Sequence, residues 1–200
     1  LRHEKDPFTP ITALRHLADE DLAVIFHLGD YIYEYATPDN AVRPIAGPET
    51  IGLDQYRQRY AQYRTDPDLQ AAHASTPFVV TWDDHEVDND YAGPHAEDKA
   101  PRAAFLRRRA AAYQAYYEHM PLRRRRRPTG PDMPLYRALG YGDLASFHVL
   151  DTRQYRTPQP CGAPRAALCE ATNDPQATIL GPHQRTWLFS GLQRSTARWN

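Results

Sequence analysis

The chain is 200 residues long and nearly neutral, with 24 Lys and Arg residues against 25 Asp and Glu residues. This balance excludes a general affinity for nucleic acid or anionic membranes, and no apolar run approaches the length needed to span a bilayer. The length suffices for one domain with a hydrophobic core, and the 18 prolines, 13 tyrosines and 2 methionines predict a loop-rich chain rather than a helical bundle.

The first half of the chain predicts two buried strands separated by helices. Thr9 is the expected N-cap of a first helix, with Pro10 at its first position. Residues 24–28 form a short apolar run without helical spacing, which indicates a buried strand, and residues 77–82 form another. The remaining expected elements are a surface loop over 36–52 and a helix over 53–64 whose packing face carries Leu53, Tyr56, Tyr60 and Tyr63. Asp66-Pro67-Asp68 is then expected to restart a short helix that runs through residues 69–74.

The second half predicts a long helix over residues 101–118, a β-hairpin and a last helix. The expected hairpin strands are residues 135–139 and 144–150, joined by a Gly-Tyr-Gly-Asp turn. The last helix, over 180–192, should direct Leu188 and Leu192 inward, and the residues from Thr196 onward should lead into a further strand. Short buried strands that end at polar residues are typical of an α/β fold.

Polar residues gather where the two buried strands end. The first strand stops at Gly29 and Asp30, and the second runs into acids and an imidazole at residues 83–90. Ligands bind at the carboxyl ends of the strands in such sheets, so these groups should share one crevice. Carboxylate oxygens, a histidine nitrogen and a phenolate suit one or two metal ions, whose charge offsets the repulsion within an acidic cluster.

Both clusters resemble motifs of the calcineurin-like metallophosphoesterases. Residues 29–33, Gly-Asp-x-x-Tyr, are similar to the tyrosine form of the first motif, in which purple acid phosphatases bind ferric iron through a phenolate. Residues 83–86, Asp-Asp-His-Glu, stand where that superfamily has Gly-Asn-His-(Asp/Glu). With their flanking residues, the two motifs look most like those of the PhoD-type alkaline phosphatases.

Two later segments support the likeness. They are Asp-x-Arg-x-Tyr at residues 151–155 and Leu-Gly-x-x-Gln-x-x-Trp-Leu at residues 180–188. The resemblance implies an α/β fold of the metallophosphoesterase type, a sandwich with helices flanking central β-sheets. It also implies that residues 1–200 form a single, partial domain that is incomplete at both ends, and because the sequence begins at Leu1 we expect an internal fragment that need not be active alone.

The likeness and the chemistry of the side chains together predict the metal ligands. Asp30 is the expected bridging ligand, because a carboxylate offers two oxygens. Tyr33 would bind the harder ion and Asp84 the second one, and Asn89 is a further candidate ligand. The resemblance implies two or more metal ions, with iron(III) and calcium expected first and zinc or manganese as alternatives.

Two residues are expected to act on the substrate. The resemblance implies that His85 donates a proton to the leaving oxygen, the role of its counterpart in the wider superfamily, and the alternative is that it supports a ligand. Arg153 would contact phosphate, because a guanidinium presents a planar fork to phosphate oxygens. Four further residues are expected to hold the ligands and the acting side chains in position without contacting the ions or the substrate: Asp83, Glu34, Glu86 and Asp151.

The two cysteines, Cys161 and Cys169, lie in a loop rich in Pro, Gly and Ala. A disulfide is the preferred interpretation, since an otherwise floppy loop gains most from cross-linking in an oxidising compartment. A zinc pair is the alternative, but no Cys-x-x-Cys spacing or histidine cluster supports it.

Five consecutive arginines at residues 123–127 suggest an anionic-polymer-binding surface. We favour a solvated loop after a helix, where cations offset the helix dipole, because the charge of the rest of the chain is balanced. Likewise, core packing is favoured over substrate stacking for the tyrosine face of the helix at 53–64.

The expected function is metal-dependent hydrolysis of phosphate esters, in which a metal-activated water or hydroxide attacks phosphorus. The expected partner is a small phosphate mono- or diester, with no specific reading of nucleic acid, and we expect a monomer that is secreted or associated with the periplasm or cell wall. Two alternatives remain: a non-catalytic calcium-binding module built on the acidic loop at 83–90, and an anionic-polymer-binding module led by residues 123–127.

Overall fold

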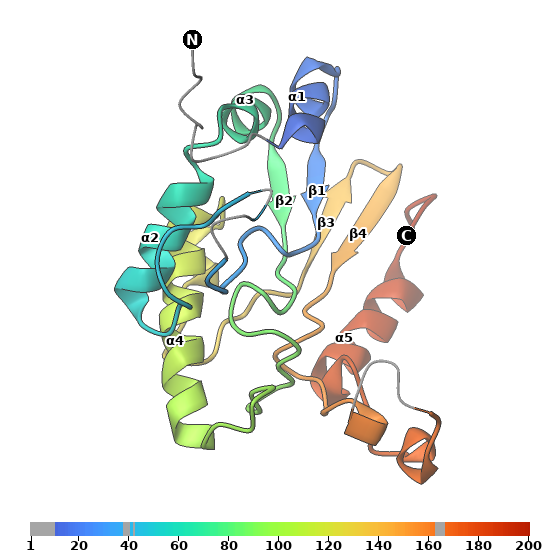
Figure 1. Ribbon diagram of the computed structural model, residues 1–200. Coiled ribbons are helices and arrows are strands. Elements are labelled where there is room, and N and C mark those ends of the chain that lie inside the picture. Colours follow the sequence, from blue (N-terminus) through green and yellow to red (C-terminus); the bar gives the residue numbers. More distant parts are fainter. Residues whose placement is uncertain (1–10, 38–40, 42, 163–166) are drawn as a thin grey trace.

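The computed structural model describes residues 11–37, 41, 43–162 and 167–200, which form a mixed α/β arrangement (Figure 1). The α-helices are α1 (Thr12–Asp19), α2 (Leu53–Tyr63), α3 (Pro67–Ser75), α4 (Arg102–His119) and α5 (Gly181–Arg194). The strands are β1 (Ile25–His27), β2 (Phe78–Val80), β3 (Arg137–Tyr141) and β4 (Ala145–Val149). Three short 3-10 turns complete the described elements: η1 (Arg124–Arg126), η2 (Pro160–Gly162) and η3 (Glu170–Asn173).

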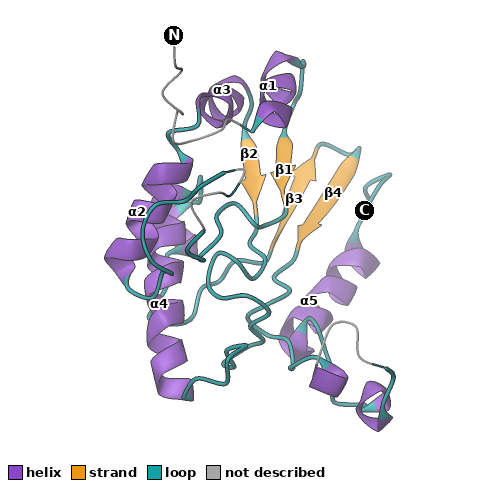
Figure 2. Cartoon of the chain, in the orientation of Figure 1, coloured by secondary structure: helices purple, strands orange, loops and turns teal. Residues whose placement is uncertain are grey.

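The described strands form two small sheets. Strands β1 and β2 are parallel, with Ile25 opposite Phe78 and His27 opposite Val80, while β3 and β4 are antiparallel (Figure 2). The two sheets are joined by a ring contact between Phe26 and Phe147, whose centroids are 4.6 Å apart. The predicted α/β class is therefore confirmed, and the parallel pairing brings the carboxyl ends of β1 and β2 to the same edge.

The first four α-helices form two packed pairs, and the fifth lies beside the second sheet. Helix α2 packs against α4 and α1 packs against α3, whereas α5 lies beside the β3–β4 hairpin (Figure 1). None of the described helices combines the length and the apolar content that a bilayer span requires.

An aromatic core lies between the helices and the sheets. The ring of Trp82 stacks on Tyr113 with centroids 4.1 Å apart, and Tyr56 and Tyr60 of α2 are completely buried. The predicted packing role of the tyrosine face is confirmed, but the hydroxyls do not all lie at its rim. Tyr56 donates a hydrogen bond of 2.5 Å to the carbonyl of Val87, inside the core.

A single buried carboxylate anchors the start of two helices. Asp66 caps α3 by accepting the backbone N–H groups of Asp68 and Leu69, and it also accepts the N–H of Ile11 at the start of α1. With Asp66 as the N-cap and Pro67 at the first position, α3 begins in the Asp66-Pro67-Asp68 segment where the sequence predicted the helix to restart. Thr9 and Pro10, the expected start of the first helix, lie outside the described residues.

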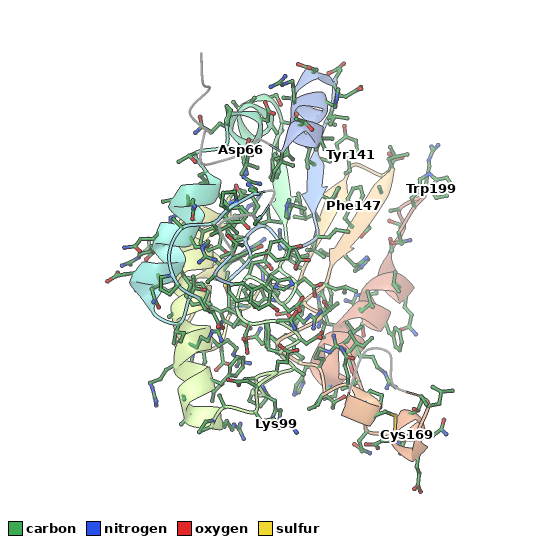
Figure 3. The ribbon with its side chains drawn as sticks, viewed as in Figure 1. Asp66, Lys99, Tyr141, Phe147, Cys169 and Trp199 are labelled. Atoms are coloured by element: carbon green, nitrogen blue, oxygen red, sulfur yellow. A yellow bond between two sulfur atoms is a disulfide. The ribbon has the colours of Figure 1, made fainter. Side chains whose placement is uncertain are left out.

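The hairpin is shifted along the chain relative to the prediction. Strand β3 runs two residues later than expected at both ends, because Leu135 is buried in the core rather than paired in the sheet. The turn closes with the N–H of Leu144 donating to the carbonyl of Tyr141, which lies at the hairpin tip, and Gly142 adopts a φ of 55° (Figure 3). Phe147 lies within β4 in the same view.

Helix α5 is anchored by a buried polar side chain, while Leu188, one of the two leucines expected to point inward, is half-buried. The prediction for Leu192 was wrong, because its side chain is 41% exposed. Gln184 is buried instead: its Oε1 accepts the N–H of Asp151 and its Nε2 donates to the carbonyl of the same residue. Beyond α5, Trp199 forms one parallel bridge with Ala145, the start of the expected strand.

Candidate metal centre

The loops that follow β1 and β2 touch because the first one contains a glycine. Gly29 has a φ of 120°, and a Cβ at this position would lie 2.2 Å from the backbone nitrogen of Asp83. Only glycine therefore permits this approach. The next residue, Asp30, also has a positive φ of 56°, which directs the chain sharply away from the strand.

Three predicted site residues converge where these loops meet. Asp30, Asp84 and His85 each offer a ligand atom, and these atoms all lie within 4.8 Å of one another. Asp84 is buried, while Asp30 and His85 are partly exposed. Tyr33 joins the group, since its hydroxyl donates to Asp30 Oδ2 at 3.3 Å and its ring lies 4.3 Å from that of His85.

The electrostatics of the cluster favour a cation. Burial raises the pKa of Asp30, and the neighbouring carboxylates of Asp83 and Asp84 raise it further against the opposing effect of His85. Burial and the neighbouring Asp30 carboxylate together raise the pKa of Tyr33 to about 12, so deprotonation of the phenol would require a bound cation.

The donor set fits a metal ion. Asp30 Oδ1 is a buried oxygen with no hydrogen-bond partner among the described residues, which is an unfavourable state unless another group binds it. A cation would satisfy that oxygen and offset the repulsion between the carboxylates. Two carboxylates, one imidazole and one phenol are ligands that both hard and borderline metal ions accept.

A buried glutamate from the first loop holds the second loop in place. Glu34 is fully buried and its two oxygens face His85 Nδ1 at 2.8 Å and the backbone N–H of Asn89 at 2.7 Å. Because Nδ1 is engaged, Nε2 is the nitrogen that His85 has available for the cluster. Burial alone would lower the pKa of His85, but the hydrogen bond and charge of Glu34 outweigh it and raise the pKa.

A second glutamate makes the reciprocal connection. Glu86, also fully buried, accepts the backbone N–H of Tyr31 at 2.6 Å and that of Asp83 at 2.9 Å. Burial raises the pKa of Glu86 to about 7 in spite of these backbone donors. Both predicted supporting glutamates thus bridge the loops.

Arg153 reaches the cluster from the segment after β4. Its guanidinium forms ion pairs with Asp83 at 2.5 Å, Asp84 at 3.0 Å and Asp90 at 3.6 Å, and the residue is only 8% exposed. Its expected contact with phosphate is not tested by this arrangement. The buried Nη1 is the atom of the ion pair with Asp90, and it makes no hydrogen bond among the described residues.

Asp151 stabilises the turn that carries Arg153 by accepting backbone hydrogen bonds from it. Its carboxylate is fully buried and accepts the indole N–H of Trp82 and the backbone N–H groups of Arg153 and Gln154. Burial raises the pKa of Asp151. It belongs to the supporting structure and is absent from the group of converging ligand atoms found in the described residues.

Sequence reasoning did not single out Asp90. Its backbone N–H donates to Asp84 Oδ2 at 2.6 Å, and its carboxylate accepts the amide of Gln159 at 3.2 Å. Asp90 has a φ of 50°, a conformation that Asp tolerates better than most residues. The position of Asp90 at the end of the acidic run 83–90 was the one feature of the sequence that could have indicated a role for it. Its hydrogen-bond partners depend on the tertiary structure.

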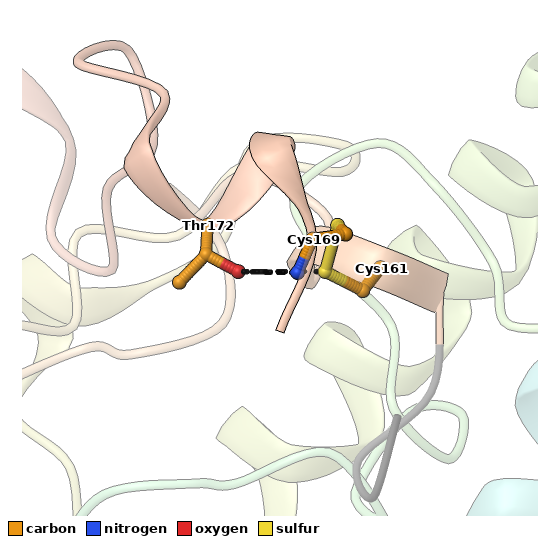
Figure 4. Close-up of a disulfide and its surroundings, with 3 residues drawn as sticks. All are labelled: Cys161, Cys169 and Thr172. Atoms are coloured by element: carbon orange, nitrogen blue, oxygen red, sulfur yellow. Dashed lines mark hydrogen bonds between the residues drawn. A yellow bond between two sulfur atoms is a disulfide. The ribbon is translucent and has the colours of Figure 1, made fainter. Parts of the chain in front are cut away.

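The disulfide expected from the sequence is present, joining Cys161 and Cys169 (Figure 4). The hydroxyl of Thr172 accepts the backbone N–H of Cys169 in the same loop. The zinc alternative for this pair is therefore excluded in the oxidised chain.

A cavity of about 450 Å³ opens beside the cluster. Asp30 and Tyr33 form one wall, and the rings of Tyr31, Tyr35 and Tyr63 line it together with aliphatic side chains. Of the candidate ligands, Asp30 and Tyr33 therefore border a space large enough for a small organic group.

Parallel strands with carboxylates and an imidazole at their carboxyl ends define an α/β protein with a candidate cation site. The chain belongs to the PhoD-like phosphatase family, whose model matches residues 5–200. It is 53% identical over 194 residues to alkaline phosphatase D of Bacillus subtilis (strain 168), an alignment that covers 94% of this chain and 33% of the relative.

The fold is also similar to a solved structure described as "Structure of PhoD". The TM-score is 0.92 at 52% sequence identity, and the match covers 98% of this chain and 38% of that chain. The chain thus spans less than two fifths of the length of the relatives that it matches.

Proposed function

We propose that the protein containing this chain hydrolyses phosphate esters with the help of metal ions bound at the ends of β1 and β2. The observation that carries the proposal is the convergence of Asp30, Asp84 and His85, whose ligand atoms lie within 4.8 Å of one another. One oxygen of Asp30 is buried and has no hydrogen-bond partner among the described residues. The family and the name of the B. subtilis relative support the same reaction.

The chemistry of the bound ions would be to lower the pKa of a water molecule and to neutralise the phosphoryl oxygens. Asp30 would share its two oxygens between ions, Tyr33 would supply a phenolate and Asp84 a second carboxylate. Asn89 is proposed as a further ligand because its loop is fixed to Glu34 through its own backbone N–H. We propose iron(III) and calcium, with zinc or manganese as alternatives.

His85 and Arg153 would act on the ester itself. With Nδ1 held by Glu34, His85 presents Nε2 as the atom that could donate a proton to the leaving oxygen. Arg153 would direct Nη1, which makes the long ion pair with Asp90 but no hydrogen bond among the described residues, toward a phosphate oxygen. Its other nitrogens would stay on Asp83 and Asp84. Asp83, Glu34, Glu86 and Asp151 would keep these groups in position.

The wider architecture is proposed on the basis of the family. We propose that the chain is one partial domain of the metallophosphoesterase type, in which the two small sheets belong to a sandwich. We also propose a small phosphate mono- or diester as substrate, a monomeric state, and a secreted or cell-wall location, the last supported by the disulfide between Cys161 and Cys169.

The proposal is tested in the full-length protein with a panel of phosphate mono- and diesters. Asp30→Asn and Asp84→Asn should abolish turnover and reduce metal content, while thermal unfolding shows that the variants remain folded. Asp143→Asn, an exposed carboxylate at the hairpin turn, is the matched control and should retain full activity. Unchanged turnover in the Asp30 and Asp84 variants would overturn the proposal.

Further measurements on the same full-length protein separate the proposal from the two alternatives. A calcium-binding module would bind the ion through the loop at 83–90 without turning over any ester. An anionic-polymer-binding module would show salt-sensitive binding that survives chelation. A visible charge-transfer band that is lost in Tyr33→Phe would favour iron over calcium or zinc.

A further inference from the structure

A second pocket, of about 200 Å³, lies where η1 meets β2 and β3. Its floor is apolar and includes Phe78 and Leu139. Four cationic side chains line it: Arg123, Arg125, Arg126 and Arg137. No residue of the candidate metal centre takes part, so this basic pocket is a separate feature of the molecule.

Two of the arginines are held rigidly by backbone carbonyl groups. Arg137 donates to Val80 at 2.8 Å and to Leu135 at 3.2 Å, and Arg126 donates to Pro134 at 2.7 Å. The tertiary structure thus fixes two guanidinium groups from different segments at the same pocket. This convergence is not expected of a freely solvated charged loop.

No carboxylate of the described residues pairs with the positive charge of the basic pocket. None of its four arginines forms an ion pair with a carboxylate in the described part of the chain, whereas Arg108 and Arg153 each pair with two or more. Burial lowers the pKa of Arg126 and of Arg137, and neighbouring arginine charge lowers both further.

One donor inside this group is also unsatisfied. Arg126 Nε is buried and has no hydrogen-bond partner among the described residues. A buried N–H that lacks an acceptor is unfavourable, and so is the mutual repulsion of partly buried cations. A single anion would relieve both.

We propose that the basic pocket binds a phosphate-type oxyanion through Arg125, Arg126 and Arg137. Guanidinium groups match the geometry of phosphate oxygens and form charge-assisted hydrogen bonds with them. The anion has two possible sources, free inorganic phosphate or the phosphate group of an organic molecule whose apolar part would lie on Phe78 and Leu139. The site is independent of the proposed hydrolysis.

Calorimetric titration of the full-length protein tests the proposal, with inorganic phosphate and phenylphosphonate as the two probes. Arg125→Ala should weaken one binding event by about tenfold or more, as expected for the loss of a charge-assisted contact. Arg124→Ala is the matched control, because Arg124 lies in the same turn but does not line the pocket, and it should bind as the unmodified protein does. Ester turnover should be unchanged in both.

The two probes distinguish the sources of the anion. Tighter binding of phenylphosphonate indicates an organic phosphate, and tighter binding of inorganic phosphate indicates the free ion. The proposal is overturned if Arg125→Ala binds the probes normally, or if Arg124→Ala weakens binding equally. Arg124 and Arg125 are exposed, so their variants should fold.

Discussion

The buried carboxylate of Glu86 accepts the backbone N–H of Tyr31 at 2.6 Å, joining the loop after β2 to the loop after β1. Glu34 makes the opposite connection, from the first loop to His85 and Asn89 of the second. Each loop therefore inserts a fully buried glutamate into the other. The geometry of the candidate metal centre depends on this exchange.

Removing the Glu86 carboxylate should destabilise the fold. Glu86→Ala leaves the N–H groups of Tyr31 and Asp83 buried without acceptors, and we expect a loss of about 2–5 kcal/mol in the free energy of unfolding. Denaturant titration measures it. Glu20→Ala, at an exposed position, should change stability by less than about 0.5 kcal/mol, and equal losses in the two variants would refute the structural role of Glu86.

Gly29→Ala should separate the two loops. Its Cβ would lie 2.2 Å from Asp83 N at a φ of 120°, so steric overlap adds to backbone strain. We expect a loss of about 4 kcal/mol or more together with loss of metal binding. Gly47→Ala is the matched control, because Gly47 has a φ of 92° but nothing within 4 Å of the added Cβ, and only the backbone effect of about 1–3 kcal/mol should appear.

Glu34→Gln should impair the site more than the fold. An amide stabilises the N–H of His85 less than a carboxylate does. Substituting a residue that hydrogen-bonds to a functional side chain typically reduces activity by about 10–100-fold. Turnover of an activated phosphate ester and the nitrogen chemical shifts of the His85 imidazole measure the effect. Glu97→Gln should alter neither. An unchanged His85 signal in Glu34→Gln would exclude the positioning role.

Removing metal should lower the thermal stability of the protein only while the cluster is intact. An ion bound solely to the folded state stabilises it by about 2.7 kcal/mol at one hundred times its dissociation constant. Chelation should therefore lower the melting temperature of the unmodified protein but leave that of Asp30→Asn unchanged. If chelation lowers the melting temperature of both proteins equally, the stabilising ion binds outside the cluster of Asp30, Asp84 and His85.

The contact between α2 and α4 should depend on pH. The hydrogen bond from Arg57 lowers the pKa of Glu118 from 4.5 to about 2, so the folded state favours the ionised form. The resulting stabilisation is fully present above pH 4.5 and is lost as the pH falls toward 2. Because the pair is exposed, the effect should be small. Melting curves of Glu118→Gln and the unmodified protein should converge on acidification, and a constant gap would contradict this assignment.

Much of the fold could be predicted because its signals are local. Apolar runs without helical spacing marked β1 and β2, and the spacing of the tyrosines marked α2. The secondary-structure and packing predictions were wrong where tertiary contacts, rather than neighbours in the sequence, decided the position of a residue. Leu135 entered the core instead of β3, and Leu192 stayed exposed because Gln184 anchors α5.

The sequence by itself placed Asp30, Asp84 and His85 directly after buried strands, since a strand end is recognisable from its neighbours. Only the tertiary structure decided which groups hold them. The parallel register of β1 and β2 sets Glu34 against His85 and Glu86 against Tyr31, pairs that are 51 and 55 positions apart. Arg153 likewise turned toward Asp83, 70 positions away. Such contacts depend on strand register and on burial, which the order of residues along one segment does not specify.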